Sequence, residues 1–117
     1  MLRIMCKSKI HRARITETDL HYEGSIGIDK TLLDASDIFE YEVVQVLNVE
    51  TGARFETYTI CEKANSGRVV LYGPAARLGT AGDVVIVIAK TFLATEKIDT
   101  LKPRVVYVNK NNKIIQK

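Results

Sequence analysis

Gly24–Ser25 joins a residue that has no Cβ to a residue that carries a hydroxyl nucleophile. A serine hydroxyl that attacks the carbonyl carbon of the preceding residue converts an amide into an ester. Gly24 favours this step, because its backbone can take a strained or positive-φ conformation and leaves its carbonyl open to close approach. Glycine and serine are also ordinary turn residues, so the interpretation depends on the rest of the chain.

Three further segments accompany the pair: Lys9–Arg12, Arg54–Tyr58 and Tyr72–Arg77. Together with Leu20–Ser25, they closely resemble the pyruvoyl-dependent aspartate 1-decarboxylases, small bacterial enzymes that make β-alanine for pantothenate synthesis. The resemblance covers nearly the whole chain and weakens only close to the C-terminus.

The resemblance implies that the chain cuts itself between Gly24 and Ser25 into the pieces 1–24 and 25–117. Loss of the Ser25 Cα proton from the ester would release the Gly24 carboxylate, and hydrolysis of the resulting dehydroalanine would leave a pyruvoyl group and ammonia. This catalytic ketone would form a Schiff base with L-aspartate and accept the electron pair released with carbon dioxide. No free cofactor or metal is then required.

The family pattern also assigns the residues around the substrate. Arg54 and Lys9 would hold a substrate carboxylate, since a guanidinium can pair with it bidentately, and Tyr58 would return a proton to the substrate. Strand alternation puts Arg54 and Tyr58 on one face and Thr57 on the other. The family nevertheless places Thr57 beside the reacting group, so we expect a bulge or a contribution across a subunit boundary. The alternatives are solvated surface charges for Lys9 and Arg54 and an ordinary half-buried aromatic for Tyr58.

Gly73, Pro74 and Ala75 match the small-residue loop of the family, whose backbone lies against the substrate. Glycine at position 73 allows that close approach. The chain departs from the common family pattern in having Tyr72 in place of an asparagine, and Pro74 lacks a backbone N–H. These differences bear on the rate of processing or on substrate affinity.

Two histidines, His11 and His21, lie near these segments in the sequence. Either side chain is able to shuttle a proton near neutral pH, but a structural or surface role is the expectation for both. No third ligand stands at a recognisable spacing, so we expect no metal site.

The composition indicates one small domain with a core, since the chain has 117 residues of which 46% are hydrophobic. The net charge of +3 is interspersed along the chain, which is too dilute for a nucleic-acid footprint but suits a site for a dicarboxylate. Cys6 and Cys61 have no partners at zinc or disulfide spacing. Met1–Lys7 lacks a secretory apolar region, and the longest apolar run, Val84–Ala89, is too short to cross a bilayer. We therefore expect a cytoplasmic protein that does not bind membranes.

Short strands separated by turn signals predict a mainly β fold that closes into a small barrel with a few short helices. The family fold is a double-psi β-barrel, and the family is homotetrameric with sites between subunits. Asp29 is the expected cap of a helix over Lys30–Ala35, and Glu50–Gly52 is a hairpin turn. The expected strands are Leu2–Lys7, Ile10–Thr16, Ile26–Ile28, Glu42–Val49, Ala53–Glu62, Arg68–Tyr72, Val84–Ala89 as a core strand buried on both faces, and a terminal hairpin of Arg104–Asn109 with Lys113–Gln116, while Thr95–Leu101 is a second short helix.

Two other interpretations remain open. The first is a non-catalytic β-barrel binding module, such as one for nucleic acid, because small barrels often bind partners and the chain is mildly basic. Its weakness is that the five Tyr and three Phe do not alternate with basic residues as in stacking platforms. The second keeps the family fold without its activity, if Tyr72 and Pro74 block maturation.

Overall fold

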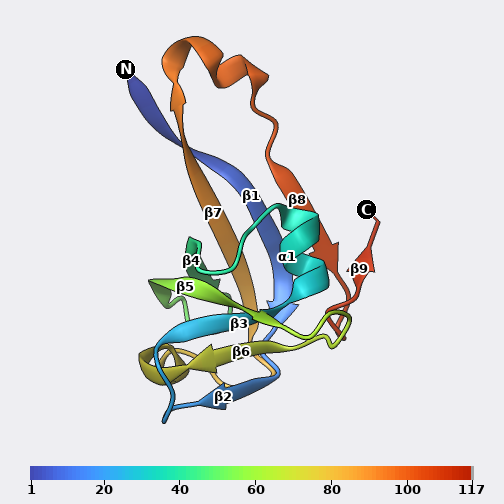
Figure 1. Ribbon diagram of the computed structural model, residues 1–117. Helices are drawn as coiled ribbons and strands as arrows, with labels where there is room; N and C mark the ends of the chain where they lie inside the picture. The colour runs from blue at the N-terminus through green and yellow to red at the C-terminus, as the bar shows by residue number, and fades with distance from the viewer. Residues whose placement is uncertain (117) are drawn as a thin grey trace.

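Strands dominate the computed structural model, which describes residues 1–116 (Figure 1). They are β1 (Leu2–Arg14), β2 (Glu17–Asp19), β3 (Ser25–Asp29), β4 (Val43–Asn48), β5 (Arg54–Glu62), β6 (Val69–Tyr72), β7 (Val84–Ala94), β8 (Arg104–Val108) and β9 (Ile114–Ile115). The helices are short: α1 (Lys30–Ser36) and the 3-10 segments η1 (Gly73–Arg77) and η2 (Thr95–Thr100). The predicted mainly β fold with a few short helices is confirmed. Lys117, the last residue of the predicted domain, lies outside the described residues.

The strands follow the order β2-β6-β3-β5-β4-β7-β1-β8-β9 in one mixed sheet. β1 and β2 are separated only by Ile15 and Thr16, yet β2 pairs with β6 whereas β1 pairs with β7 and β8. The amide of Thr16 donates to the carbonyl of Val69 at 2.8 Å, which extends the contact with β6. This continuous stretch joins two distant parts of the strand order, while closure into a double-psi barrel stays a prediction.

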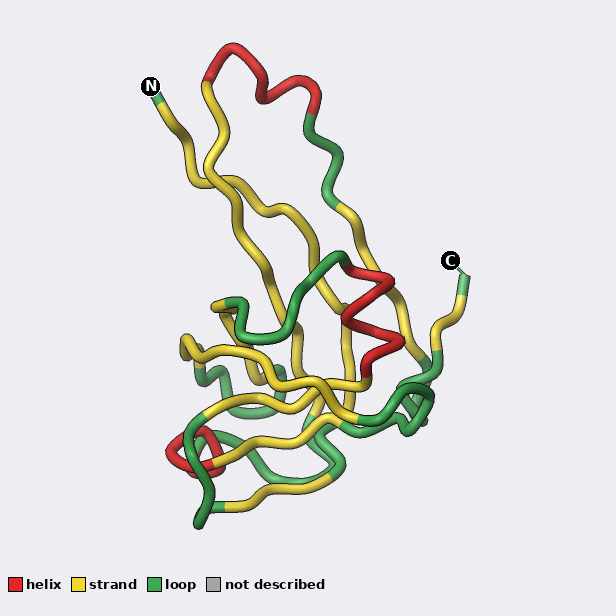
Figure 2. The backbone as a smooth tube through the Cα atoms, in the orientation of Figure 1, coloured by secondary structure: helices red, strands yellow, loops and turns green. Residues whose placement is uncertain are grey.

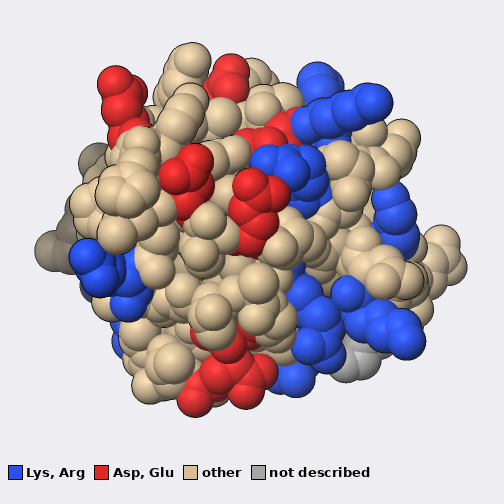
Figure 3. All heavy atoms as spheres, turned by 90° about the horizontal axis from the view of Figure 1, so that it is seen from below, with Lys and Arg blue, Asp and Glu red and all other residues tan. Residues whose placement is uncertain are grey.

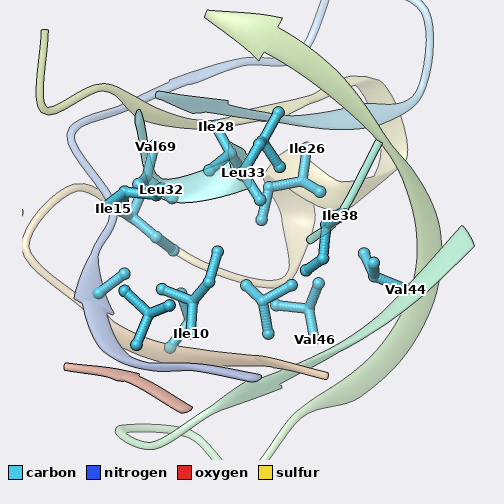
Figure 4. Close-up of a cluster of buried hydrophobic side chains, with 14 of the residues drawn as sticks. Ile10, Ile15, Ile26, Ile28, Leu32, Leu33, Ile38, Val44, Val46 and Val69 are labelled. Atoms are coloured by element: carbon cyan, nitrogen blue, oxygen red, sulfur yellow. The ribbon is translucent and has the colours of Figure 1, made fainter. Parts of the chain in front are cut away.

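The core is a cluster of aliphatic side chains mainly from β1, β3, β4, β6, β7, β8 and α1 (Figure 4). Ile10, Ile26, Ile28 and Val46 are fully buried within it. Each buried aliphatic side chain contributes roughly 1.5–3 kcal/mol relative to an exposed one. All five residues of β3 are buried, because β5 and β6 pair with it on its two sides.

β7 differs from the prediction in burial and in length. Val85, Val87 and Ala89 have no exposed surface, but Ile86 and Ile88 are only half-buried. One face of this strand therefore packs in the core, whereas burial on both faces was expected. The strand also continues to Ala94 as the partner of β1.

β1 is one long strand where two were expected. The polar Ser8 and Lys9 interrupt its apolar pattern, but both keep their pairing with β7, and the two register shifts lie between Cys6 and Ser8 and between Ile10 and Ala13. The pairs from Leu2 with Ala94 to Cys6 with Lys90 form an arm that projects from the body of the molecule (Figures 1 and 2). The other predicted hairpins are present, since β4 pairs with β5 and β8 with β9.

β2 and the 3-10 segment η1 were not expected. None of the helices described here has the length and apolar character needed to cross a membrane.

The carboxylate of Asp29 anchors the end of β3, and its predicted role as the cap of α1 is confirmed. Its Oδ1 accepts hydrogen bonds from the amides of Thr31 at 2.8 Å and Asn65 at 2.9 Å, and its Oδ2 accepts from the amide of Gly67 at 2.9 Å. Asp29 is 1% exposed, so water cannot replace it as an acceptor. One side chain thus joins the start of the helix to the turn that leads into β6.

Replacing Asp29 with alanine should therefore lower the free energy of unfolding by about 2–4 kcal/mol, because a helix cap is lost and buried amides are left without acceptors. Denaturant unfolding at a fixed protein concentration measures this loss. Asp34→Ala is the matched control, since Asp34 is an exposed carboxylate that forms an ion pair with Lys30, and it should change stability far less. Equal effects of the two substitutions would contradict the anchoring role.

Candidate active site

Ser25 is the first residue of β3 and lies opposite Tyr72 in the antiparallel pairing with β6. The residue is fully buried, and its Oγ has no hydrogen-bond partner among residues 1–116. Buried hydroxyls are normally hydrogen-bonded, and each exception calls for an explanation. The hydroxyl that follows Gly24 is therefore held out of water and is available for chemistry.

The start of η1 packs directly against the residues that precede Ser25. Gly73 has φ +62°, and a Cβ there would lie 2.6 Å from the carbonyl oxygen of Tyr22 and 2.8 Å from the amide nitrogen of Gly24. A Cβ on Gly24 would lie 3.2 Å from Cδ of Pro74. Position 73 requires glycine both for its backbone conformation and for this close approach. The predicted small-residue loop thus lies against the proposed cut.

A cavity of about 230 Å³ opens beside Gly24. It is lined by Gly24, Phe55, Glu56, Thr57, Pro74, Ala75 and Leu78. Ligand pockets usually measure about 300 Å³ or more, so this cavity suits only a small substrate. The predicted residues Thr57, Pro74 and Ala75 are brought together with Gly24.

Thr57 reaches this cavity without any irregularity in β5. It lies opposite the buried Val44 in an unbroken register with β4, and directly opposed residues point to the same face of a sheet. Thr57 therefore points inward, and the bulge that we considered is absent. Its hydroxyl is the only alcohol among the side chains that line the cavity.

The predicted charged and acid groups lie on the opposite, outer face of the sheet. Arg54 and Tyr58 flank Thr57 in β5 at the alternate positions, as expected, and Tyr58 lies opposite the exposed Val43. Lys9 lies on the same face as Glu56, because Glu56 pairs with Gln45, Gln45 with Ile88, and Ile88 with Lys9 across adjacent strands.

Lys9, Arg54 and Tyr58 do not line the cavity beside Gly24, whereas Glu56, which shares their face of β5, does. No salt bridge within residues 1–116 engages Lys9 or Arg54, so their charges are available to an anion. One chain thus presents the predicted site as two separate halves.

Tyr58 is held by the turn that precedes β4. The ring of Tyr41 lies 6.4 Å from the ring of Tyr58, measured between centroids, although Tyr41 has the unfavourable φ of +70°. Thr59 fixes this turn, because its Oγ1 donates to the carbonyl of Phe39 at 2.7 Å and its own carbonyl accepts from the amide of Tyr41 at 2.8 Å. The aromatic pair defines one end of the outer half of the site.

Tyr72 does not take the place of an amide donor at the cut. Its hydroxyl donates to Oε2 of Glu62 at 2.8 Å. Burial, together with this hydrogen bond, raises the pKa of Tyr72, so the phenol keeps its proton at neutral pH. Since a phenol has one O–H, it cannot also donate to the carbonyl oxygen of Gly24.

The predicted site residues did not include Phe55, Glu56 and Leu78 of the cavity wall, or Glu62 beside Tyr72. Phe55 and Glu56 stand within the Arg54–Tyr58 segment, and Leu78 directly follows Tyr72–Arg77, so these three residues carried a signal, whereas Glu62 carried none.

The two histidines have different environments. His11 is half-buried, with its ring edge against Tyr107 at a centroid distance of 5.6 Å, and His21 is exposed. Within residues 1–116, no cluster of three or more His, Cys, Asp or Glu side chains is arranged to hold a metal. His11 lines a larger hollow of about 400 Å³. None of the residues that line this hollow lines the cavity beside Gly24.

Charge is mixed over the face that carries β2 and β6. Figure 3 shows lysine and arginine side chains among aspartate and glutamate side chains on this face. The lysine and arginine side chains gather mostly towards one side of this face and the acidic side chains towards the middle and the other side, so the face carries both signs and no uniformly basic field (Figure 3).

Known proteins resemble this chain along almost its whole length. The family model for aspartate decarboxylase matches residues 1–115. The chain is 48% identical over 113 residues to the aspartate 1-decarboxylase of Thermoanaerobacter pseudethanolicus, covering 97% of each protein. It is 51% identical to that of Acaryochloris marina, over 99% of this chain and 88% of the relative. It is 55% identical to that of Campylobacter jejuni, over 92% and 85%.

The family model matches almost the entire chain, and the relatives are about half identical over most of their length. This chain therefore belongs to the aspartate decarboxylase family.

Proposed function

We propose that this chain decarboxylates L-aspartate to β-alanine and carbon dioxide, after cutting itself between Gly24 and Ser25. Family membership supports the reaction and its place in pantothenate synthesis, and it does not favour a non-catalytic binding module. The observation that carries the self-cutting is the buried Ser25 hydroxyl, which has no hydrogen-bond partner among the described residues. Cytoplasmic location stays a prediction.

Ser25 is the nucleophile of the maturation step. Its Oγ attacks the carbonyl carbon of Gly24, and the hydroxyl of Thr57 is the side-chain donor available in the adjacent cavity to the developing negative charge. Pro74 has no backbone N–H and Tyr72 donates to Glu62, so neither contributes a donor there.

The surroundings of position 25 fit a pyruvoyl group. Among residues 1–116, the Ser25 Oγ makes no hydrogen bond, so converting the serine into a ketone would break none. A small cavity also lies beside Gly24. Such a ketone supplies the electron sink for loss of carbon dioxide from an amino acid.

The remaining chemistry belongs to the outer-face residues. Arg54 and Lys9 bind the carboxylate that stays on the substrate, Arg54 through its planar fork and Lys9 as a point charge. Tyr58 delivers a proton from its Oη to the carbon that has lost the other carboxylate.

Because Lys9, Arg54 and Tyr58 do not line the cavity of their own chain, we propose that a complete site forms between two copies in a homotetramer. The outer face and the projecting arm support an interface, since Leu2 is 66%, Ile4 65%, Val43 57% and Phe92 69% exposed. Large apolar side chains gathered in one region are typical of a protein contact. A second copy would cover them and bring its outer-face cations to the cavity.

An intact-mass measurement on denatured protein tests self-cutting. We expect two fragments, 1–24 and 25–117, with a keto group at the start of the second, and Ser25→Ala should remain a single folded chain. Ser8→Ala is the matched control, because Ser8 also has a buried Oγ without a partner among residues 1–116, and this variant should be cut normally. A wild-type chain that stays whole would overturn the proposal.

Arg54→Ala should lower kcat/KM for aspartate by an amount on the order of 2–5 kcal/mol, the cost of removing one partner of a desolvated charge pair. Steady-state kinetics on fully cut protein measure the loss. Arg104→Ala, which removes another exposed arginine of the sheet, should leave kcat/KM unchanged. Wild-type kinetics in Arg54→Ala would refute carboxylate binding by this residue.

Co-expression of Ser25→Ala with Arg54→Ala tests the shared site. Each variant alone should be nearly inactive, but mixed tetramers contain sites in which one copy supplies Ser25 and its neighbour supplies Arg54. Activity should therefore reappear in the mixture. Mixing Arg54→Ala with the double variant Ser25→Ala/Arg54→Ala is the control and should restore nothing. No recovery in stable mixed tetramers would mean that each site draws on one chain only.

A further inference from the structure

A chain of polar side chains extends from the residue opposite Ser25 to the far edge of the sheet. Tyr72 donates to Oε2 of Glu62 at 2.8 Å, Oε1 of Glu62 accepts from Nε of Arg68 at 2.9 Å, and Nη1 of Arg68 lies 2.9 Å from Oε1 of Glu17. Glu62 ends β5, Arg68 precedes β6 and Glu17 begins β2. The network joins the strands that surround the start of β3.

The inner end of this network is shielded from solvent. The side chain of Glu62 is 12% exposed, and hydrogen bonding to Glu62 raises the pKa of Arg68. Hydrogen bonds to charged groups contribute more than neutral ones, and more still when water is excluded. The position of the Tyr72 hydroxyl is therefore fixed by Glu62.

Gly27 reserves the space for this contact. A Cβ at position 27 would overlap Oε2 of Glu62 and lie 2.8 Å from Cε2 of Tyr72. Gly27 is buried in β3, two residues after Ser25. The strand that carries the nucleophile thus has the Tyr72–Glu62 pair packed directly on it.

Tyr72 also touches the residues on the other side of the proposed cut. The ring of Tyr22 packs on the ring of Tyr72, with centroids 4.6 Å apart and planes tilted by 42°. Tyr22 is 52% exposed, so this ring contact is made at the surface of the molecule. The neighbours Gly73 and Pro74 approach Gly24 as described above.

We propose that Tyr72, Glu62 and Arg68 are positioning residues for maturation: they fix the Tyr72 ring, and the ring holds Tyr22–Gly24 so that the Gly24 carbonyl faces Ser25. This inference rests on the self-cutting proposed above. Tyr72 acts through packing and does not touch the reacting atoms with its hydroxyl, because that hydroxyl is donated to Glu62. After the bond between Gly24 and Ser25 is cut, these contacts are no longer needed, so turnover of the mature enzyme does not depend on them.

The decisive variant is Tyr72→Phe, which keeps the ring and removes the hydrogen bond. In a pulse-chase measurement of the first-order cutting rate, we expect a fall of roughly tenfold or more. The fully cut variant should keep wild-type kcat and KM per ketone, with the ketone titrated by a carbonyl reagent. A general structural defect would instead lower the thermal unfolding midpoint, and it would reduce the cutting rate and kcat together.

Substitutions of Glu62 provide a second, independent test. Glu62→Gln retains an oxygen that accepts from Tyr72, so it should cut faster than Glu62→Ala. In the double variant Tyr72→Phe/Glu62→Ala, the cutting rate should fall by less than the product of the two single effects, because both substitutions break the same contact. Tyr107→Phe, a tyrosine of β8, is the matched control and should mature at the wild-type rate.

The outcomes separate the two proposals. If the wild type is not cut, self-cutting itself fails. If the wild type is cut and Tyr72→Phe is cut at the same rate, only the positioning role fails. A Tyr72→Phe protein whose kcat falls as much as its cutting rate would also overturn the inference, because Tyr72 would then belong to the turnover machinery.

Discussion

The pairing of β3 with β5 on one side and β6 on the other is the constraint on which the site depends. All five residues of β3 are buried, so its two ends are fixed within the sheet. At one end Asp29 binds three backbone amides, and at the other Ser25 lies opposite Tyr72. A hydroxyl anchored in this way is held beside Gly24 with little conformational freedom, and orientation of that kind accounts for much of the rate of an intramolecular reaction.

Local signals in the sequence predicted local structure well. The Asp29 cap and the turn at Gly52, which has φ +78°, each depend on residues close to one another in the chain. β2 could not be found in this way, since Glu17–Asp19 is short and polar and exists only through its pairing with β6. The length of β7 was missed for the same reason, because Thr91–Ala94 gains its strand structure from β1.

The site was predictable in its residues more than in its arrangement. Alternation along β5 correctly separated Thr57 from Arg54 and Tyr58, but the unbroken register with β4 was needed to discard a bulge. Nothing in the sequence indicated that Tyr72 hydrogen-bonds Glu62, because that contact joins the end of one strand to the end of another. Gly27 makes this contact possible and carries no distinctive sequence signal of its own.

The long pairing of β1 with β7 has a consequence for a chain severed after Gly24. The shorter piece would hold β1 and β2, which remain hydrogen-bonded to β7, β8 and β6, so the two pieces would stay associated as one particle. Once melted, however, they would separate, and recovery would become a bimolecular encounter that slows with dilution. The durability of the mature form would then reside in its slow dissociation, as kinetic rather than equilibrium stability.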